Sequence, residues 1–270
     1  MNNKILRDRS KSLRKRIFQS VHDGNGGHIG GSFSVIDLLN YLYSEVMVFD
    51  PKQPQLSSRD RLILSKGHSC LALYWTLAEF GYFDAELIES YGQDGSVFAG
   101  HPEYNKGSGI EISSGSLGHG PSIGVGIAHA LKLKKINSRV FVIIGDGESN
   151  EGSVWEAAMS AAQLKLDNFY IILDNNGMES LDRTDNIMSI EPIDKKFDAF
   201  GFDVTRANGH DFEEIHQYFQ NLDTENGRPK CLIADTIKGY GLSFTQGVAK
   251  WHFRSPSDEE LKLGLKELSN

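Results

Sequence analysis

Two short polar segments follow two apolar runs in the middle of the chain. Gly145-Asp146-Gly147 comes directly after the run 139–144. Asn175-Asn176 follows the run 168–173, separated from it by one polar residue, Asp174. The 27 residues 148–174 that separate them can hold one crossover helix, so both segments can lie at one sheet edge. Carboxylate and amide oxygens suit Mg²⁺ or Ca²⁺, ions that pair with diphosphates. The alternative is that Asp146 and Asn176 only cap turns, the commoner role for an isolated Gly-Asp-Gly.

Other ligand-binding motifs are not matched. Glu151 stands where an EF-hand loop needs glycine, and Ala157 where it needs its bidentate Glu. The chain has no P-loop, and no dinucleotide-binding G-x-G-x-x-G follows a strand. Among the nine histidines, those with no motif around them are expected to be structural. These are His22, His129, His210 and His216.

The elements that must position these residues alternate along the chain. Strands are predicted at 60–65, 139–144, 168–173, 202–205 and 231–236. Helices are predicted at 4–21, 34–44, 69–80, 153–165 and 212–222, and a further helix begins at residue 121. Little regular structure is expected over 92–120. Continuous apolar runs of strand length, separated by helices, indicate a parallel sheet covered on both faces. We therefore predict a doubly wound α/β fold, residues 1–270 forming a single domain with an N-terminal helical segment.

Composition narrows the function classes. The chain has 270 residues, 39% apolar and 24% charged, which is ordinary for a folded domain. A net charge of -8 argues against a general binder of nucleic acid or anionic membrane. No apolar run approaches the roughly 20 residues that cross a bilayer, and Met1–Arg16 lacks the apolar core of a signal peptide. Two cysteines are too few for a disulfide framework, so the cytoplasm is the expected compartment.

The order of seven segments resembles the transketolase family. They are Gly-His-Ile-Gly-Gly at 27–31, Ser-Lys-Gly-His at 65–68, His-Pro-Glu at 101–103, Gly-Ser-Leu-Gly-His-Gly at 115–120, Gly-Asp-Gly-x-x-x-Glu-Gly at 145–152, Thr-Ile-Lys-Gly at 236–239 and Trp-His at 251–252. The resemblance covers nearly the whole chain. It is closest to the separate N-terminal subunit of split bacterial transketolases, which binds the diphosphate of thiamine diphosphate.

This resemblance implies a role for each matching residue. Metal ligands would be Asp146, Asn176 and the main-chain carbonyl of Met178, with Mg²⁺ expected and Ca²⁺ or Mn²⁺ as alternatives. The cofactor would be bound by Gly115, Ser116, Leu117, Gly147, Glu148, Lys238, His68 and His252. The substrate channel and its catalytic groups would comprise His28, His68, His101 and His252, with Glu151 near a subunit interface.

The resemblance also implies what lies outside this chain. The Glu that activates the cofactor belongs to a pyrimidine-binding domain in the family, so a C-terminal partner subunit is expected, in a complex of two plus two. The small side chains of Gly124, Gly126, Ala157, Ala158, Ala161 and Ala162 are expected to permit close packing in that complex. The implied reaction moves a two-carbon ketol unit from a ketose, or ketose phosphate, to an aldehyde. The alternative is a subunit like deoxyxylulose-phosphate synthase or a dehydrogenase E1, which decarboxylates a 2-oxo acid.

Three departures from the family pattern bear on the substrate. His119 stands where Gln is usual, residues 179–183 replace the usual Gln and Ile-Asp-Gly stretch, and Phe253 replaces Gly. We expect these positions to lie near the cofactor and channel. They favour an enzyme specialised for a modified or nucleotide-linked sugar over the housekeeping pentose-phosphate enzyme.

Overall fold

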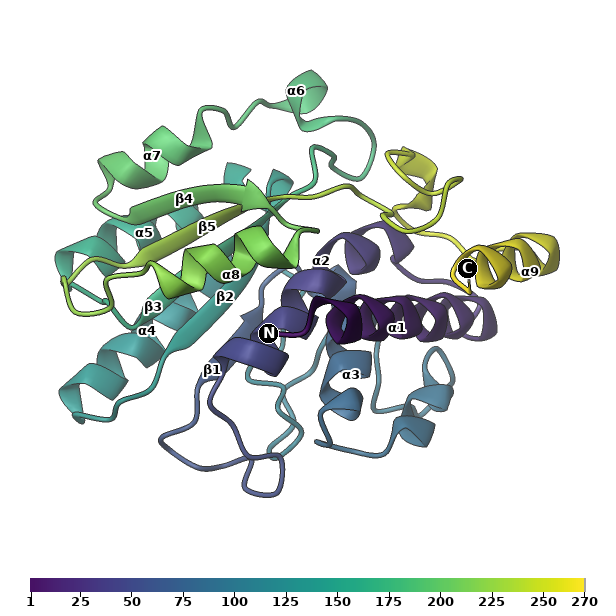
Figure 1. Ribbon diagram of the computed structural model, residues 1–270, viewed down its shortest axis with the longest axis horizontal. Coiled ribbons are helices and arrows are strands. Elements are labelled where there is room, and N and C mark those ends of the chain that lie inside the picture. The colour runs from purple at the N-terminus through teal and green to yellow at the C-terminus, as the bar shows by residue number, and fades with distance from the viewer. Residues whose placement is uncertain (270) are drawn as a thin grey trace.

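A five-stranded parallel sheet forms the centre of the protein, seen here in a computed structural model that describes residues 1–269 (Figure 1). Its strands are β1 (Arg61–Leu64), β2 (Val140–Gly145), β3 (Phe169–Asn175), β4 (Asp203–Asn208) and β5 (Lys230–Asp235). They lie in the order β1-β2-β3-β5-β4, and every neighbouring pair is parallel. This confirms the predicted doubly wound α/β fold.

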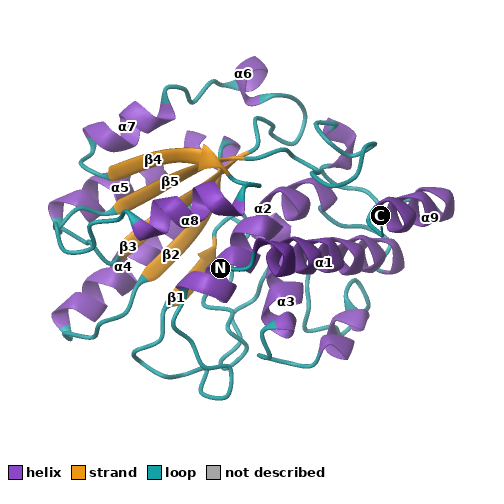
Figure 2. Cartoon of the chain, viewed as in Figure 1, coloured by secondary structure: helices purple, strands orange, loops and turns teal. Residues whose placement is uncertain are grey.

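Alternate side chains of each strand point to opposite faces, and each face has its own apolar core. The core on one face includes side chains of α1 (Asn3–Asp23), α2 (Ile29–Tyr41), α3 (Cys70–Glu79) and α8 (Phe212–Gln220). The other face packs against α4 (His119–Leu133), α5 (Gly152–Gln163) and α7 (Ile193–Ala199). Figure 2 shows these helices and the strands in the same view as Figure 1. Because both faces are covered, the central strands are apolar throughout, which is why the sequence predicted them well.

The edge strand β4 differs from its prediction. The apolar pattern predicted a strand over 202–205, whereas β4 runs from Asp203 to Asn208 and includes Arg206. An edge strand pairs on one side only and is partly exposed, so polar side chains are compatible with its pairing.

Several helices also differ from their predictions. Helix α2 begins at Ile29, whereas the prediction began it at residue 34. The first turn includes Gly30 and Gly31, and glycines are poor indicators of a helix in a sequence. The short helices α6 (Thr184–Ile187) and α7, and α9 (Asp258–Glu267), were not predicted. A capping box formed by Ser257 and Glu260 begins α9 and is the sequence signal that could have found it. Over residues 1–269, no helix is long and apolar enough to cross a membrane.

The small residues of α4 and α5 pack on the protein's own sheet. A Cβ placed on Gly124 would lie 2.6 Å from the Val142 side chain, and Ala157, Ala158 and Ala161 are buried in the core above the strands. These positions were expected to serve packing between subunits, and for these four residues that prediction is wrong. Gly126 is different, because it is exposed and a Cβ added to it would have no atom within 4 Å.

Candidate active site

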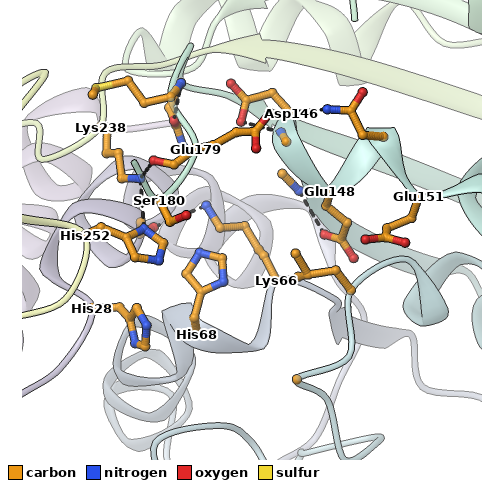
Figure 3. A pocket seen from close by; sticks show the side chains of 18 of the residues that line it. His28, Lys66, His68, Asp146, Glu148, Glu151, Glu179, Ser180, Lys238 and His252 are labelled. Carbon is orange, nitrogen blue, oxygen red and sulfur yellow. Dashed lines mark hydrogen bonds between the residues drawn. The ribbon is translucent and has the colours of Figure 1, made fainter. Parts of the chain in front are cut away.

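A cavity of about 410 Å³ opens where β1, β2 and β3 end, at the carboxyl edge of the sheet. Ligands of open parallel sheets bind at this edge. The cavity is lined by every predicted site residue except Ser116, several of which are labelled in Figure 3. The full predicted set in the lining is His28, His68, His101, Gly115, Leu117, Asp146, Gly147, Glu148, Glu151, Asn176, Met178, Lys238 and His252.

The loops that follow β2 and β3 are bonded to each other through Asp146. Its carboxylate accepts hydrogen bonds from the Gly147 amide at 2.9 Å and from the Gly177 amide at 2.6 Å. The Met178 amide donates to the Asn176 side-chain oxygen at 3.1 Å. The three predicted metal-binding residues therefore come from two adjoining loops.

The electrostatics of this corner favour a cation. Burial, and then the negative charge of Asp174, raise the pKa of Asp146 to about 6. A nearby cation would relieve both effects, because it favours the charged carboxylate. Within residues 1–269 there is no cluster of three or more His, Cys, Asp or Glu side chains arranged to hold a metal. The predicted ligand set would not form such a cluster, since it contains one carboxylate, one amide and one main-chain carbonyl.

Gly147 lies beneath the side chain of Glu179. A Cβ on Gly147 would come within 2.6 Å of the Glu179 Cγ atom. The Asn150 side chain donates to the Glu179 carboxylate at 3.3 Å. Glu179 and Ser180 belong to the segment that departs from the family pattern, and both line the cavity.

Lys238 provides a buried cation in the lining of the same cavity. Its Nζ donates to the Glu179 main-chain carbonyl at 2.6 Å and lies 2.9 Å from Nδ1 of His252. Burial, and then the charge of Lys66, lower the pKa of Lys238 to about 8. Burial and the Lys238 charge also lower the pKa of His252 to about 4. His252 is therefore neutral near pH 7 and can accept a hydrogen bond from Lys238.

Four histidine rings from distant segments meet beside Lys238. The ring centroid of His28 lies 5.2 Å from His68, 6.0 Å from His101 and 5.1 Å from His252. Burial is the main cause that lowers the pKa of His28 to about 3, and it also lowers the pKa of His68 well below its usual value. The Nδ1 atom of His28 is buried and has no hydrogen-bond partner among residues 1–269. His28 therefore lines the cavity with one ring nitrogen unpaired.

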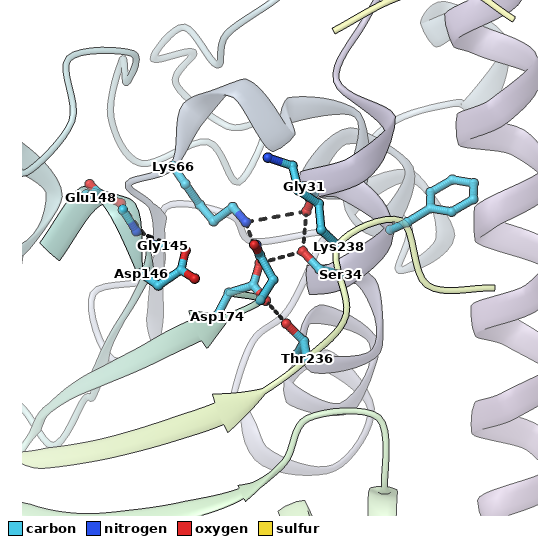
Figure 4. A network of polar contacts seen from close by, with 12 residues as sticks. Gly31, Ser34, Lys66, Gly145, Asp146, Glu148, Asp174, Thr236 and Lys238 are labelled. Carbon is cyan, nitrogen blue, oxygen red and sulfur yellow. Dashed lines mark hydrogen bonds and ion pairs between the residues drawn. The ribbon is translucent and has the colours of Figure 1, made fainter. Parts of the chain in front are cut away.

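A buried ion pair that the sequence did not predict lies under the cavity (Figure 4). Asp174 at the end of β3 bonds to Lys66, which follows β1, and both side chains are almost fully buried. Ser34 of α2 donates to the same carboxylate at 2.6 Å, and Thr236 after β5 donates to its other oxygen. One carboxylate thus joins four segments that carry cavity residues. The polar residue at the end of an apolar strand was the available signal.

Glu148 and Glu151 differ in their surroundings. The Glu148 carboxylate is buried and accepts hydrogen bonds from the Gly118 amide at 2.8 Å, the Gly145 amide at 3.0 Å and the Ser65 hydroxyl. Burial raises its pKa. This side chain therefore holds the glycine loop against the end of β2. Glu151 is exposed at the N-terminus of α5 and lines the outer part of the cavity.

Two residues of the glycine loop lie outside the cavity. Ser116 and His119 line a separate hollow with Ile123. His119 was expected near the cofactor and channel, and the structure places it in this separate hollow. For His119, the turn is at Gly118, whose φ is +79° and which separates it from the cavity residue Leu117. Phe253, the third departure, packs against His28 with ring centroids 4.8 Å apart.

Comparison with known proteins identifies the family of this chain. Residues 7–268 match the model of the family described as "Transketolase, thiamine diphosphate binding domain". The chain belongs to the transketolase family. It is similar to an apulose-4-phosphate transketolase subunit of Phocaeicola vulgatus, with 40% identity over 269 residues that cover 100% of this chain and 95% of that protein.

Two further transketolases extend the comparison. A 6-deoxy-6-sulfo-D-fructose transketolase subunit of Clostridium sp. is 37% identical over 263 residues, which cover 97% of this chain and 96% of that protein. The crystal structure of the Campylobacter jejuni transketolase superposes with a TM-score of 0.92 at 31% identity, covering all of this chain and 43% of that one. The chain thus spans nearly the whole length of the two transketolase subunits and about two fifths of the Campylobacter jejuni chain.

Proposed function

We propose that this chain is the diphosphate-binding subunit of a split transketolase, a transferase that moves a two-carbon ketol unit from a ketose to an aldehyde. The observation that carries the proposal is the contact between Asp146 and the Gly177 amide, which joins the two predicted metal-binding loops inside the cavity. Residues 1–270 would act as a single thiamine diphosphate-binding domain.

The side chains present fit the diphosphate and its metal. Asp146, Asn176 and the Met178 carbonyl offer the oxygen ligands that Mg²⁺ prefers, and Asp146 is a buried carboxylate with a raised pKa. Lys238 and His252 would donate to the phosphate oxygens that the metal leaves free. Gly147 has no side chain to block a phosphate, and the Glu179 side chain lies close to it.

The histidines would bind the sugar substrate and exchange protons with it. His28, His68 and His101 lie together on the side of the cavity next to His252, and neutral imidazoles can donate to or accept from hydroxyl groups. When bound, the thiazolium of the cofactor supplies the carbon nucleophile that carries the ketol unit. The chain's own part is to orient the sugar hydroxyls, to exchange protons with them and to keep the diphosphate in place.

A second kind of subunit would complete the site. The carboxylate that activates the aminopyrimidine belongs to the pyrimidine-binding domain in this family, so we propose a C-terminal partner and a complex of two plus two. Leu117 and Gly115 would hold the aminopyrimidine–thiazolium region of the cofactor, and Glu151 would lie near the subunit interface. We also propose a cytoplasmic location, with which the free cysteines Cys70 and Cys231 are compatible.

The substrate is proposed to be a modified sugar. The relatives named above carry apulose 4-phosphate or 6-deoxy-6-sulfo-D-fructose in their names, and neither is a standard pentose-phosphate intermediate. Two departures of this chain, Glu179 and Phe253, contact cavity residues. The 2-oxo-acid decarboxylase alternative is not favoured, because the similar proteins are named as transketolases.

Product analysis of the reconstituted complex tests this proposal. The chain would be mixed with its partner subunit, thiamine diphosphate and Mg²⁺, and given a panel of ketoses labelled with ¹³C at carbons 1 and 2. We expect both labelled carbons to appear together in a lengthened aldose acceptor. Release of CO₂ from pyruvate without transfer from any ketose would identify the decarboxylase instead.

A further inference from the structure

His210 lies outside the cavity but bonds to the segment that carries Lys238. The Ile237 amide donates to Nε2 of His210 at 3.0 Å, one residue before Lys238. Since an amide N–H can only donate, Nε2 must be the unprotonated nitrogen and the ring proton must be on Nδ1. Nδ1 lies 2.7 Å from the carboxylate of Asp37 on α2.

Asp37 in turn is fixed by Arg14 of α1. Two guanidinium nitrogens of Arg14 donate to the two oxygens of Asp37, at 3.0 and 2.6 Å, a fork geometry that gives strong, well-oriented hydrogen bonds. All three side chains are at most 6% exposed. Burial by itself would raise the pKa of Asp37, but Arg14 and the His210 hydrogen bond lower it well below its usual range. Asp37 is therefore ionised and orients the His210 ring.

The ring of His210 also packs on the same segment. It stacks on Tyr240 with centroids 3.6 Å apart and planes 13° apart, and the Arg14 guanidinium lies 5.1 Å from the same ring of Tyr240. His210 thus contacts this segment on both sides of Lys238, through the amide before it and the aromatic ring after it. The Gly239 amide donates to the Gly30 carbonyl at 2.9 Å, which adds a contact with the start of α2.

We propose that His210 is a positioning residue for Lys238, and that Arg14 and Asp37 hold it in the tautomer that accepts from Ile237. This inference rests on the proposed function, in which Lys238 donates to the cofactor diphosphate. The long side chain of Lys238 would otherwise have many rotamers open to it. The His210 contacts fix the main chain on either side of it, so that Nζ remains over the cavity. No motif surrounds His210 in the sequence, and a purely structural role was expected for it.

Two substitutions at position 210 separate positioning from general stability. In H210N the amide nitrogen can replace the Nδ1 donor to Asp37, but nothing replaces the acceptor for Ile237. In H210Q the longer side chain can place its oxygen where Nε2 lies and so accept from Ile237. The matched control is H216N, because His216 is a partly buried histidine whose Nδ1 lies 2.8 Å from the Tyr41 hydroxyl. Among residues 1–269, no hydrogen bond links His216 to residues 236–241.

Thiamine diphosphate affinity is measured by calorimetry on the complex of both subunits, at saturating Mg²⁺. We expect H210N to weaken the affinity roughly tenfold, the scale of one impaired charge-assisted hydrogen bond, with turnover at saturating cofactor near that of the wild type. H210Q should recover most of the affinity, and H216N should leave it unchanged. H210N with wild-type affinity would overturn the proposal, as would H210Q losing as much as H210N.

Amide hydrogen exchange and ¹⁵N NMR of the full chain test the contact without the cofactor. The Ile237 amide should exchange slowly in the wild type and H210Q and faster in H210N, and the His210 ring should carry its proton on Nδ1. A ring protonated on Nε2 near pH 7 would overturn the proposal even if every variant failed to fold. A wild-type complex that binds no thiamine diphosphate would refute the proposed function, and with it the link to Lys238, whereas these measurements would still report the His210 contact.

Discussion

Replacing Lys66 with methionine removes the positive half of the buried ion pair with Asp174. Lys66 is 1% exposed and Asp174 is fully buried, so the remaining carboxylate would have no access to water. Removing one partner of a buried pair typically costs about 3–5 kcal/mol of folding free energy. Because Ser34 and Thr236 still donate to Asp174, we expect a value near the lower end, about 3 kcal/mol.

Urea denaturation followed by circular dichroism measures this cost. K132M is the matched control, because Lys132 forms a pair with Asp167 at 2.7 Å but is 38% exposed. Surface pairs of this kind contribute at most about 1 kcal/mol. The double variant K66M/D174N should regain part of the stability lost in K66M, because the uncompensated charge is then removed.

The pH dependence of the loss identifies its cause. Burial alone would raise the pKa of Asp174, but Lys66, Ser34 and Thr236 lower it in the wild type. A depressed carboxyl pKa contributes stability at neutral pH that is lost only as pH falls through the folded value. Without Lys66, burial should raise this pKa, so the K66M deficit should be largest at pH 7 and shrink as the carboxyl takes up a proton. A deficit below 1 kcal/mol, or one independent of pH, would refute this reasoning.

Four further outcomes are expected. D146A should abolish Mg²⁺-dependent binding of thiamine diphosphate in calorimetry, and unchanged affinity would remove Asp146 from the metal site. In the wild type that binding should weaken as pH falls below about 6, because protons compete with the metal for Asp146, whose pKa is raised to that value; a flat profile between pH 5 and 7 would contradict this. H101A should lower turnover by roughly 10²–10⁴-fold with nearly normal cofactor affinity. Lost cofactor affinity with normal turnover at saturating cofactor would contradict the placement of His101 beside the substrate. E179Q should tighten cofactor binding several-fold, because it removes the repulsion between the Glu179 carboxylate beside Gly147 and the anionic diphosphate. Weaker binding in E179Q would instead indicate that Glu179 contributes to cofactor binding.

The sheet could be predicted where burial leaves a strong pattern. Strands β2, β3 and β5 are covered on both faces, and their continuous apolar runs predicted them to within a residue or two. The polar edge strand β4 and the short helices α6 and α7 have no such pattern, because their exposed sides accept polar residues.

The site could be predicted where function requires a residue type within a short motif. The Asp146 and Asn176 loops meet as expected because parallel strands end at one edge. The Lys66–Asp174 pair joins residues 108 positions apart, and no local spacing indicates such a contact. The same holds for His210 and Asp37, which are 173 positions apart. Ser116 is predicted together with its neighbours Gly115 and Leu117, which do line the cavity, but Ser116 itself lines a different hollow.

The central claim is that this chain holds only part of the active site and needs a partner subunit for catalysis. It is tested most directly by measuring ketol transfer while the partner subunit is titrated into this chain. Thiamine diphosphate, Mg²⁺ and a ketose donor are kept saturating, and the rate of two-carbon transfer is followed as the partner is added. The proposed function predicts no transfer by either chain on its own, and a rate that rises until the two chains are present in equal amounts. Transfer catalysed by this chain without its partner would contradict it.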